Sequence, residues 1–130
     1  MTLSRFEVGI VSADRTIVDF LAEVFELAAL PAMEFPTGTL HRLESPGAVI
    51  KVMVPRQTPK RADGEPFLAV AGIRYLSMWV DDLDGVIARA AARGGRLLYG
   101  PLELEAGARI AVMADPDGNA FEVIESAAAS

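Results

Sequence analysis

The spacing of hydrophobic residues changes several times along the first half of the chain, and each change predicts a new element. Residues 6–11 are mostly apolar and rich in β-branched side chains, so they predict a strand. Ser12 and Asp14 are residue types that favour helix N-termini, and apolar residues then recur at helical spacing. This spacing predicts an amphipathic helix over 14–28, which ends before Pro31 because proline disrupts a helix.

The next segment predicts strands joined by tight turns. Residues 31–54 predict three short strands, separated at 36–38 and 45–47, where proline and glycine gather. Residues 55–71 then combine prolines and a glycine with charges of both signs, which is typical of a linker. This linker is long for a loop, so it could also fold over a neighbouring surface.

The second half of the chain repeats the same order of elements. Residues 73–80 predict a strand, Asp81 and Asp82 open a second helix, and Gly94 and Gly95 stop it. The last two strands are joined by a tight turn with proline at its second position and glycine at its fourth. The three predicted strands are 96–102, 108–114 and 119–125.

Two pairs of matching segments indicate an internal duplication. Residues 7–14 match residues 75–82, and residues 45–51 match residues 116–122. Strand–helix–strand order also recurs by chance in α+β proteins, but the matched turns at Gly47 and Gly118 favour duplication. We therefore predict one domain over residues 1–130, with module one at about 4–54, a linker at about 55–71 and module two at about 72–126.

Composition excludes several kinds of function. The chain is 52% hydrophobic, which indicates a folded interior, and its net charge of −6 disfavours nucleic acid and anionic membranes as partners. It has no cysteine, which removes disulfides, thiolate metal sites and cysteine nucleophiles, and its one histidine excludes sites with several imidazoles. No signal-like or membrane-spanning apolar run is present, so we expect a cytoplasmic protein.

The duplicated βαβββ order and the segment Asp-Pro-Asp-Gly-Asn-Ala-Phe-Glu at 115–122 resemble the vicinal oxygen chelate superfamily. That superfamily includes glyoxalase, bleomycin-resistance proteins, methylmalonyl-CoA epimerase and ring-cleaving (extradiol) dioxygenases. The resemblance covers about residues 6–125. It implies an α+β, glyoxalase-like fold in which two βαβββ modules form a curved eight-stranded mixed sheet, a cup that holds a small-molecule ligand or substrate. It also implies a homodimer, and one divalent metal held by His, Gln or Glu from the first and last strand of each module.

Transferred to this sequence, the resemblance assigns the four metal positions to Glu7, Lys51, Tyr75 and Glu122. Only Glu122 agrees with the family, because histidine is usual at positions 7 and 75. An ammonium group has no lone pair and repels a divalent cation, and flanking carboxylates raise the pKa of a lysine rather than lower it. We therefore expect no metal cofactor. The alternative is a hard cation such as Mg²⁺, Mn²⁺ or Ca²⁺ on Glu7 and Glu122.

The same four residues are the candidate catalytic residues. We hypothesise that Lys51 takes the place of the metal and pairs with Glu122, with Glu7 as a second candidate partner, while Tyr75 donates a hydrogen bond. Either glutamate could serve as general base, with Tyr75 or Lys51 stabilising an oxyanion. Each residue also has an interpretation without a catalytic role, since strand glutamates and lysines are often solvated and tyrosines often pack at a surface.

Strand alternation extends the candidate site to ligand-binding positions, because every second residue of a strand shares a face. The surface it predicts is mostly apolar with a small polar centre, as small-molecule pockets tend to be. We therefore predict a metal-independent enzyme of lyase or isomerase type that binds a small, largely apolar organic molecule. The alternatives are an antibiotic- or metabolite-sequestering protein of the bleomycin-resistance type, and an interaction domain whose side chains fill the cup. The predicted ligand-binding residues are Gly9, Val11, Met53, Ser77, Trp79, Ala120 and Ile124.

Overall fold

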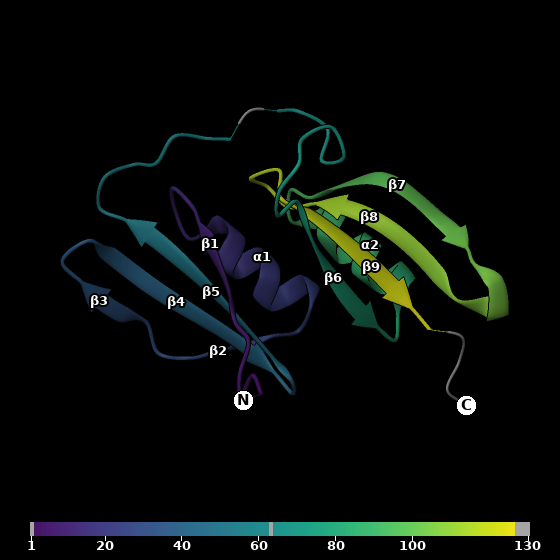
Figure 1. Ribbon diagram of the computed structural model, residues 1–130, viewed down its shortest axis with the longest axis horizontal. Coiled ribbons are helices and arrows are strands. Elements are labelled where there is room, and N and C mark those ends of the chain that lie inside the picture. The colour runs from purple at the N-terminus through teal and green to yellow at the C-terminus, as the bar shows by residue number, and fades with distance from the viewer. Residues whose placement is uncertain (1, 63, 127–130) are drawn as a thin grey trace. The chain divides into compact units, whose positions relative to one another are not determined.

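The computed structural model describes residues 2–62 and 64–126, which fold as two compact units that meet in sequence between Arg61 and Ala62. Each unit contains a mixed sheet and an α-helix (Figure 1). The α+β class and the two βαβββ modules are confirmed. The strands divide between a five-stranded and a four-stranded sheet rather than forming one sheet of eight. The additional strand arises because Pro31 separates two short strands ahead of Gly38.

The first unit is a sheet in the order β1-β5-β4-β2, with β3 also paired to β4. β1 runs parallel to β5, and the other pairs are antiparallel. Apolar side chains of the helix are buried together with Leu43, Ile50 and Val52 of the sheet, which form the core of this unit. The elements are β1 (Val8–Val11), α1 (Thr16–Val24), β2 (Ala28–Ala29), β3 (Met33–Phe35), β4 (Gly38–Ser45) and β5 (Ala48–Pro55).

Helix α1 is shorter than its hydrophobic pattern predicts, because it ends at Val24 instead of continuing to residue 28. Glu26 adopts a left-handed backbone with φ of 55°. The Leu27 amide then donates to the Ala22 carbonyl at 3.1 Å, a bond typical of a helix C-terminus. The apolar spacing continues past this point, but the left-handed residue ends the helix.

The second unit is a sheet in the order β6-β9-β8-β7, with β6 parallel to β9. The Asp82 carboxylate accepts a hydrogen bond from the Gly85 amide at 3.0 Å, so the predicted helix start is confirmed. Phe121 and Val123 of β9 and Met113 of β8 are buried beneath α2, which contacts both strands. The elements are β6 (Tyr75–Val80), α2 (Leu83–Ala92), β7 (Arg96–Glu103), a short 3₁₀ turn (Glu105–Gly107), β8 (Arg109–Ala114) and β9 (Ala120–Glu125).

The duplication seen in the sequence extends to the register of the two sheets. The parallel pair β1–β5 places Gly9 beside Lys51, and the parallel pair β6–β9 places Ser77 beside Glu122. These are the positions that the sequence matches align with each other. Gly47 and Gly118, in the turns before β5 and β9, both have a positive φ, 83° and 90° respectively. The two modules therefore share register and turn geometry as well as element order.

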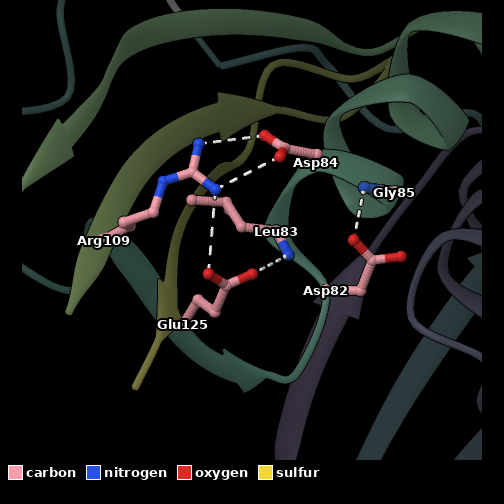
Figure 2. A network of polar contacts seen from close by, with 6 residues as sticks. All are labelled: Asp82, Leu83, Asp84, Gly85, Arg109 and Glu125. Atoms are coloured by element: carbon pink, nitrogen blue, oxygen red, sulfur yellow. Dashed lines mark hydrogen bonds and ion pairs between the residues drawn. The ribbon is translucent and has the colours of Figure 1, made fainter. Parts of the chain in front are cut away.

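An arginine on β8 fixes the start of α2 to the sheet (Figure 2). Arg109 donates two hydrogen bonds to Asp84, at 2.9 and 3.2 Å, and lies 3.7 Å from a carboxylate oxygen of Glu125. The other Glu125 oxygen accepts the Leu83 amide at 2.7 Å. The Arg109 guanidinium lowers the pKa of Asp84, which keeps this pair charged at neutral pH. The network holds the helix on one face of the sheet.

Among the described residues, no helix has the length and apolar character needed to cross a membrane.

Candidate functional site

The second unit leaves the face of its sheet opposite α2 accessible. Along β6, Tyr75, Ser77 and Trp79 are exposed, while the residues between them are half-buried. The register places these three beside Ala120, Glu122 and Ile124 of β9, and neighbours in register share a face. We call this surface the β6–β9 face, defined by Tyr75, Ser77, Trp79, Ala120, Glu122 and Ile124.

Glu122 is the polar centre of the β6–β9 face. The Ser77 hydroxyl donates a hydrogen bond to its Oε1 at 2.8 Å, which joins β6 to β9. Glu122 is half-buried, and no ion pair to it occurs among residues 2–62 and 64–126. A carboxylate in this setting has lone pairs available for a ligand or for a proton.

Aromatic side chains share this face with the carboxylate. Trp79 is 68% exposed and Tyr75 is 46% exposed. Tyr99 of β7 is 57% exposed and joins the same face, because it pairs with Val112, which in turn pairs with Glu122. Such rings offer flat apolar surface to a ligand.

Two of the predicted ligand-binding residues contribute less surface than expected. Ala120 and Ile124 are only 4% and 8% exposed, because β9 is an interior strand flanked by β6 and β8. They form the floor of the face. Phe67, from the predicted linker, packs edge-on against Tyr75 with ring centres 5.8 Å apart. This part of the linker therefore packs beside the β6–β9 face.

In the first unit, the corresponding face contains Gly9, Val11, Lys51 and Met53, which we call the β1–β5 face. The register pairs Gly9 with Lys51 and Val11 with Met53. Val11 is 59% exposed, and a Cβ added at Gly9 would meet no atom within 4 Å. The alternate residues of β5 are buried in the core, so Lys51 points away from it.

Lys51 pairs with Glu7, which lies just before β1. Its Nζ is 3.3 Å from Glu7 Oε1, and Arg5 forms an ion pair with the other carboxylate oxygen. The hydrogen bond from Lys51 lowers the pKa of Glu7, and the charges of Arg5 and Lys51 act in the same direction. The Glu7 carboxylate is thus ionised, and its charge is balanced by Arg5 and Lys51. This makes Glu7 a weak candidate for a general base.

These residues do not fit a divalent metal. Within the described chain, no group of three or more His, Cys, Asp or Glu side chains is placed to hold one. Position 51, where the family resemblance would place a ligand, carries an ammonium group engaged with Glu7. That ammonium repels a cation at contact distance and has no lone pair to donate.

The further parts of the predicted constellation stay predictions. These are the meeting of Glu7, Lys51, Tyr75 and Glu122 at one point, the Lys51–Glu122 pair, and a hydrogen bond donated by Tyr75.

Sequence reasoning missed Arg42. It lies on β4 directly opposite Lys51, so the two side chains share the β1–β5 face. The β4–β5 hairpin turns at Pro46 and Gly47, and positions 42 and 51 are equally distant from that turn. This symmetry was a usable signal, because the register of a hairpin follows from its turn.

The first unit also has a surface hollow of about 530 Å³. It contains none of the predicted site residues and no carboxylate. Its lining comes from the β3–β4 turn, the end of β5 and the segment after it, namely Pro36, Thr37, Pro55, Arg56, Gln57, Thr58 and Pro59.

Comparison with known proteins agrees with this geometry. Residues 10–123 match the Glyoxalase/Bleomycin resistance protein/Dioxygenase superfamily. A glyoxalase family protein from Bacillus cereus superposes with a TM-score of 0.83 at 17% identity, covering 96% of this chain and 95% of that one. A mutant of glyoxalase I from Zea mays superposes with a TM-score of 0.74 at 21% identity, covering 97% of this chain and 46% of that one.

A curated relative, CFP32 from Mycobacterium tuberculosis, is named as a glyoxylase. It is 42% identical over 48 residues, which make up 37% of this chain and only 18% of the relative. The superfamily match covers most of the chain, and the superposed structures share the fold of both modules. The chain belongs to the glyoxalase/bleomycin resistance protein/dioxygenase superfamily, whose fold binds small molecules.

Proposed function

We propose that this chain binds a small, largely apolar organic molecule against the β6–β9 face. The observation that carries the proposal is a carboxylate that shares a sheet face with exposed aromatic rings and forms no ion pair in the described part of the chain: Glu122, with Trp79 and Tyr75. Apolar contact surface with one or two polar groups is the usual composition of a small-molecule site. Exposed tryptophan and tyrosine rings are costly to leave in water, so a ligand that covers them gains hydrophobic free energy.

We propose further that the reaction is a proton transfer of the lyase or isomerase type, without a metal. Glu122 removes a proton from a carbon next to a carbonyl group, and the electron pair moves onto the carbonyl oxygen to form an enolate. Return of the proton to carbon restores the carbonyl and completes an isomerisation. The Tyr75 hydroxyl is the candidate donor to the enolate oxygen. Glu7 is less suited as base, because Arg5 and Lys51 compensate its charge.

A sequestering protein of the bleomycin-resistance type is the second candidate. The observation that favours it is that Glu7, one of the two predicted bases, forms ion pairs with Arg5 and Lys51, which makes it less suited to take up a proton. Such a protein would use the same face for binding and would leave the ligand unchanged. Assembly as a homodimer and a cytoplasmic location are retained as predictions.

The test of binding uses the only tryptophan of the chain, because its fluorescence reports directly on the β6–β9 face. Titration with a panel of small aromatic and aliphatic carbonyl compounds is expected to give a saturable change. For a compound that binds, Trp79→Ala is expected to weaken affinity about tenfold or more by calorimetry, since buried aromatic anchors dominate such interfaces.

Leu97→Ala is the matched control. Leu97 is 43% exposed on the same sheet, but its register with Met113 places it on the opposite face. Its affinity is expected to remain within about twofold of the parent, because surface truncations away from a site have small effects. Equal losses in both variants, or no loss in Trp79→Ala, would remove the β6–β9 face as the binding surface.

A further inference from the structure

We infer that the ligand of the β6–β9 face is an aromatic carbonyl compound, and that its ring sits in a corner formed by the side chains of Phe67 and Tyr75. This inference rests on the proposed function and deepens it, because it names the substrate class where aromatic and aliphatic compounds were both open. Phe67 is then a specificity-determining residue, although it belongs to the predicted linker and not to a strand. The evidence is the way in which its loop is held, the angle between the two rings, and their spacing from Glu122.

The loop ahead of β6, residues 67–74, is closed on itself by hydrogen bonds. The Ala69 amide donates to the Pro66 carbonyl at 2.9 Å, which forms a tight turn. The Nε of Arg74 donates to the Phe67 carbonyl at 3.2 Å, so the two ends of the loop are joined. A compact loop whose ends lie close together holds its side chains against the neighbouring structure. Phe67 is therefore held beside the first residue of β6.

The rings of Phe67 and Tyr75 stand at nearly a right angle to each other. Their centres are 5.8 Å apart and their planes are inclined by 80°, so they form two walls of a corner, which we call the Phe67–Tyr75 corner. Both residues keep accessible surface, since Tyr75 is 46% exposed and Phe67 is half-buried. The corner can therefore be reached by a ligand that lies on the β6–β9 face.

A corner of this kind distinguishes an aromatic ring from a saturated one. A flat ring that stacks on one wall meets the other wall edge-on. Both arrangements are favourable, because the face of an aromatic ring is negative and its edge is positive. A saturated ring is puckered and lacks this charge distribution, so it gains only hydrophobic contact. The geometry therefore favours an aromatic ligand over an aliphatic ligand of the same size.

The spacing between the corner and Glu122 indicates how the ring is joined to the carbonyl group. Tyr75 and Ser77 are alternate residues of β6 on one face, about 6–7 Å apart along the strand. Because the Ser77 hydroxyl donates to Glu122, the carboxylate lies level with Ser77 and one such step from Tyr75. A benzene ring bonded directly to a carbonyl carbon spans this step. With its ring in the corner, the carbon next to the carbonyl lies beside the carboxylate.

The experiment uses acetophenone and cyclohexyl methyl ketone as probes. Both are uncharged methyl ketones with a six-membered ring, and only the first ring is aromatic. In calorimetric titrations of the full chain, acetophenone is expected to bind about three- to tenfold more tightly, the gain that a favourable aromatic pair provides. Nuclear Overhauser effects are expected between the ring protons of bound acetophenone and those of Phe67 and Tyr75.

Three variants of the loop test the role of the Phe67 ring. Phe67→Leu keeps an apolar side chain without a ring, so the affinities for the two ketones are expected to come within about twofold of each other, through weaker acetophenone binding. Phe67→Tyr retains the ring and is expected to retain the preference. Leu68→Ala is the matched control, because Leu68 is 78% exposed in the same loop, and it is expected to leave both affinities within about twofold of the parent.

Equal binding of the two ketones by the parent chain would overturn the inference, and so would an undiminished preference in Phe67→Leu. Overhauser effects from bound acetophenone to Trp79, with none to Phe67 or Tyr75, would overturn it on the parent chain alone, whether or not a variant folds. If aliphatic carbonyl compounds bind and acetophenone does not, the inference fails while the proposed function stands. Absence of binding by every carbonyl compound would overturn both.

Discussion

Replacing Glu122 with glutamine is expected to lower turnover by about 10²- to 10⁴-fold, the usual contribution of a general base. Glutamine retains the shape of the side chain and an oxygen that accepts the Ser77 hydroxyl, but it cannot take up a proton. Ligand affinity is therefore expected to change little. The measurement is deuterium incorporation from D₂O at the carbon next to the carbonyl of a compound that binds, followed by NMR.

Glu103→Gln is the control, because Glu103 is an exposed glutamate at the end of β7 in the same sheet. Unchanged exchange in Glu122→Gln would exclude Glu122 as the base. Tight binding without exchange for every carbonyl compound in the panel would instead favour the sequestering protein over the enzyme.

Replacing Phe121 with alanine is expected to cost about 3–5 kcal/mol of unfolding free energy, the range for large-to-small changes of buried aromatic residues. Phe121 is 1% exposed and lies on β9 immediately before Glu122, with its side chain on the opposite, helix-covered face. A loss of this size removes much of the stability of a small domain, which is typically about 5–15 kcal/mol. Urea denaturation followed by circular dichroism measures it.

The matched variant is Phe6→Ala, because Phe6 is 72% exposed and loses little contact on truncation. Its unfolding free energy is expected to stay within about 0.5 kcal/mol of the parent. A small effect of Phe121→Ala would contradict the placement of the core between β9 and α2.

Strand alternation and the duplication predicted much of what the structure shows. The match of residues 7–14 with 75–82 makes Gly9 equivalent to Ser77, and the match of residues 45–51 with 116–122 makes Lys51 equivalent to Glu122. The observed registers agree with both equivalences. Alternation is reliable here since each sheet buries one face under a helix, which fixes which residues point inward.

Other features depend on contacts that a linear pattern does not contain. The end of α1 is set by the left-handed backbone at Glu26, a conformation that few non-glycine residues adopt. The ion pair between Arg5 and Glu7 depends on the path of the chain ahead of β1, where the side-chain alternation of a strand does not apply. The face on which Arg42 lies follows from its register partner Lys51 on β5. The sequence of β4 alone does not assign it, because polar residues occur at neighbouring positions on both faces of that strand.

The ammonium of Lys51, paired with Glu7, stands where the superfamily resemblance would place a metal ligand. Calorimetric titration of the chelator-treated protein with Mn²⁺ and Zn²⁺ tests it most directly. We expect no saturable one-site binding of either ion at millimolar concentration, and the same result for Glu7→Gln. Stoichiometric binding of either ion that is lost in Glu7→Gln or Glu122→Gln would contradict it.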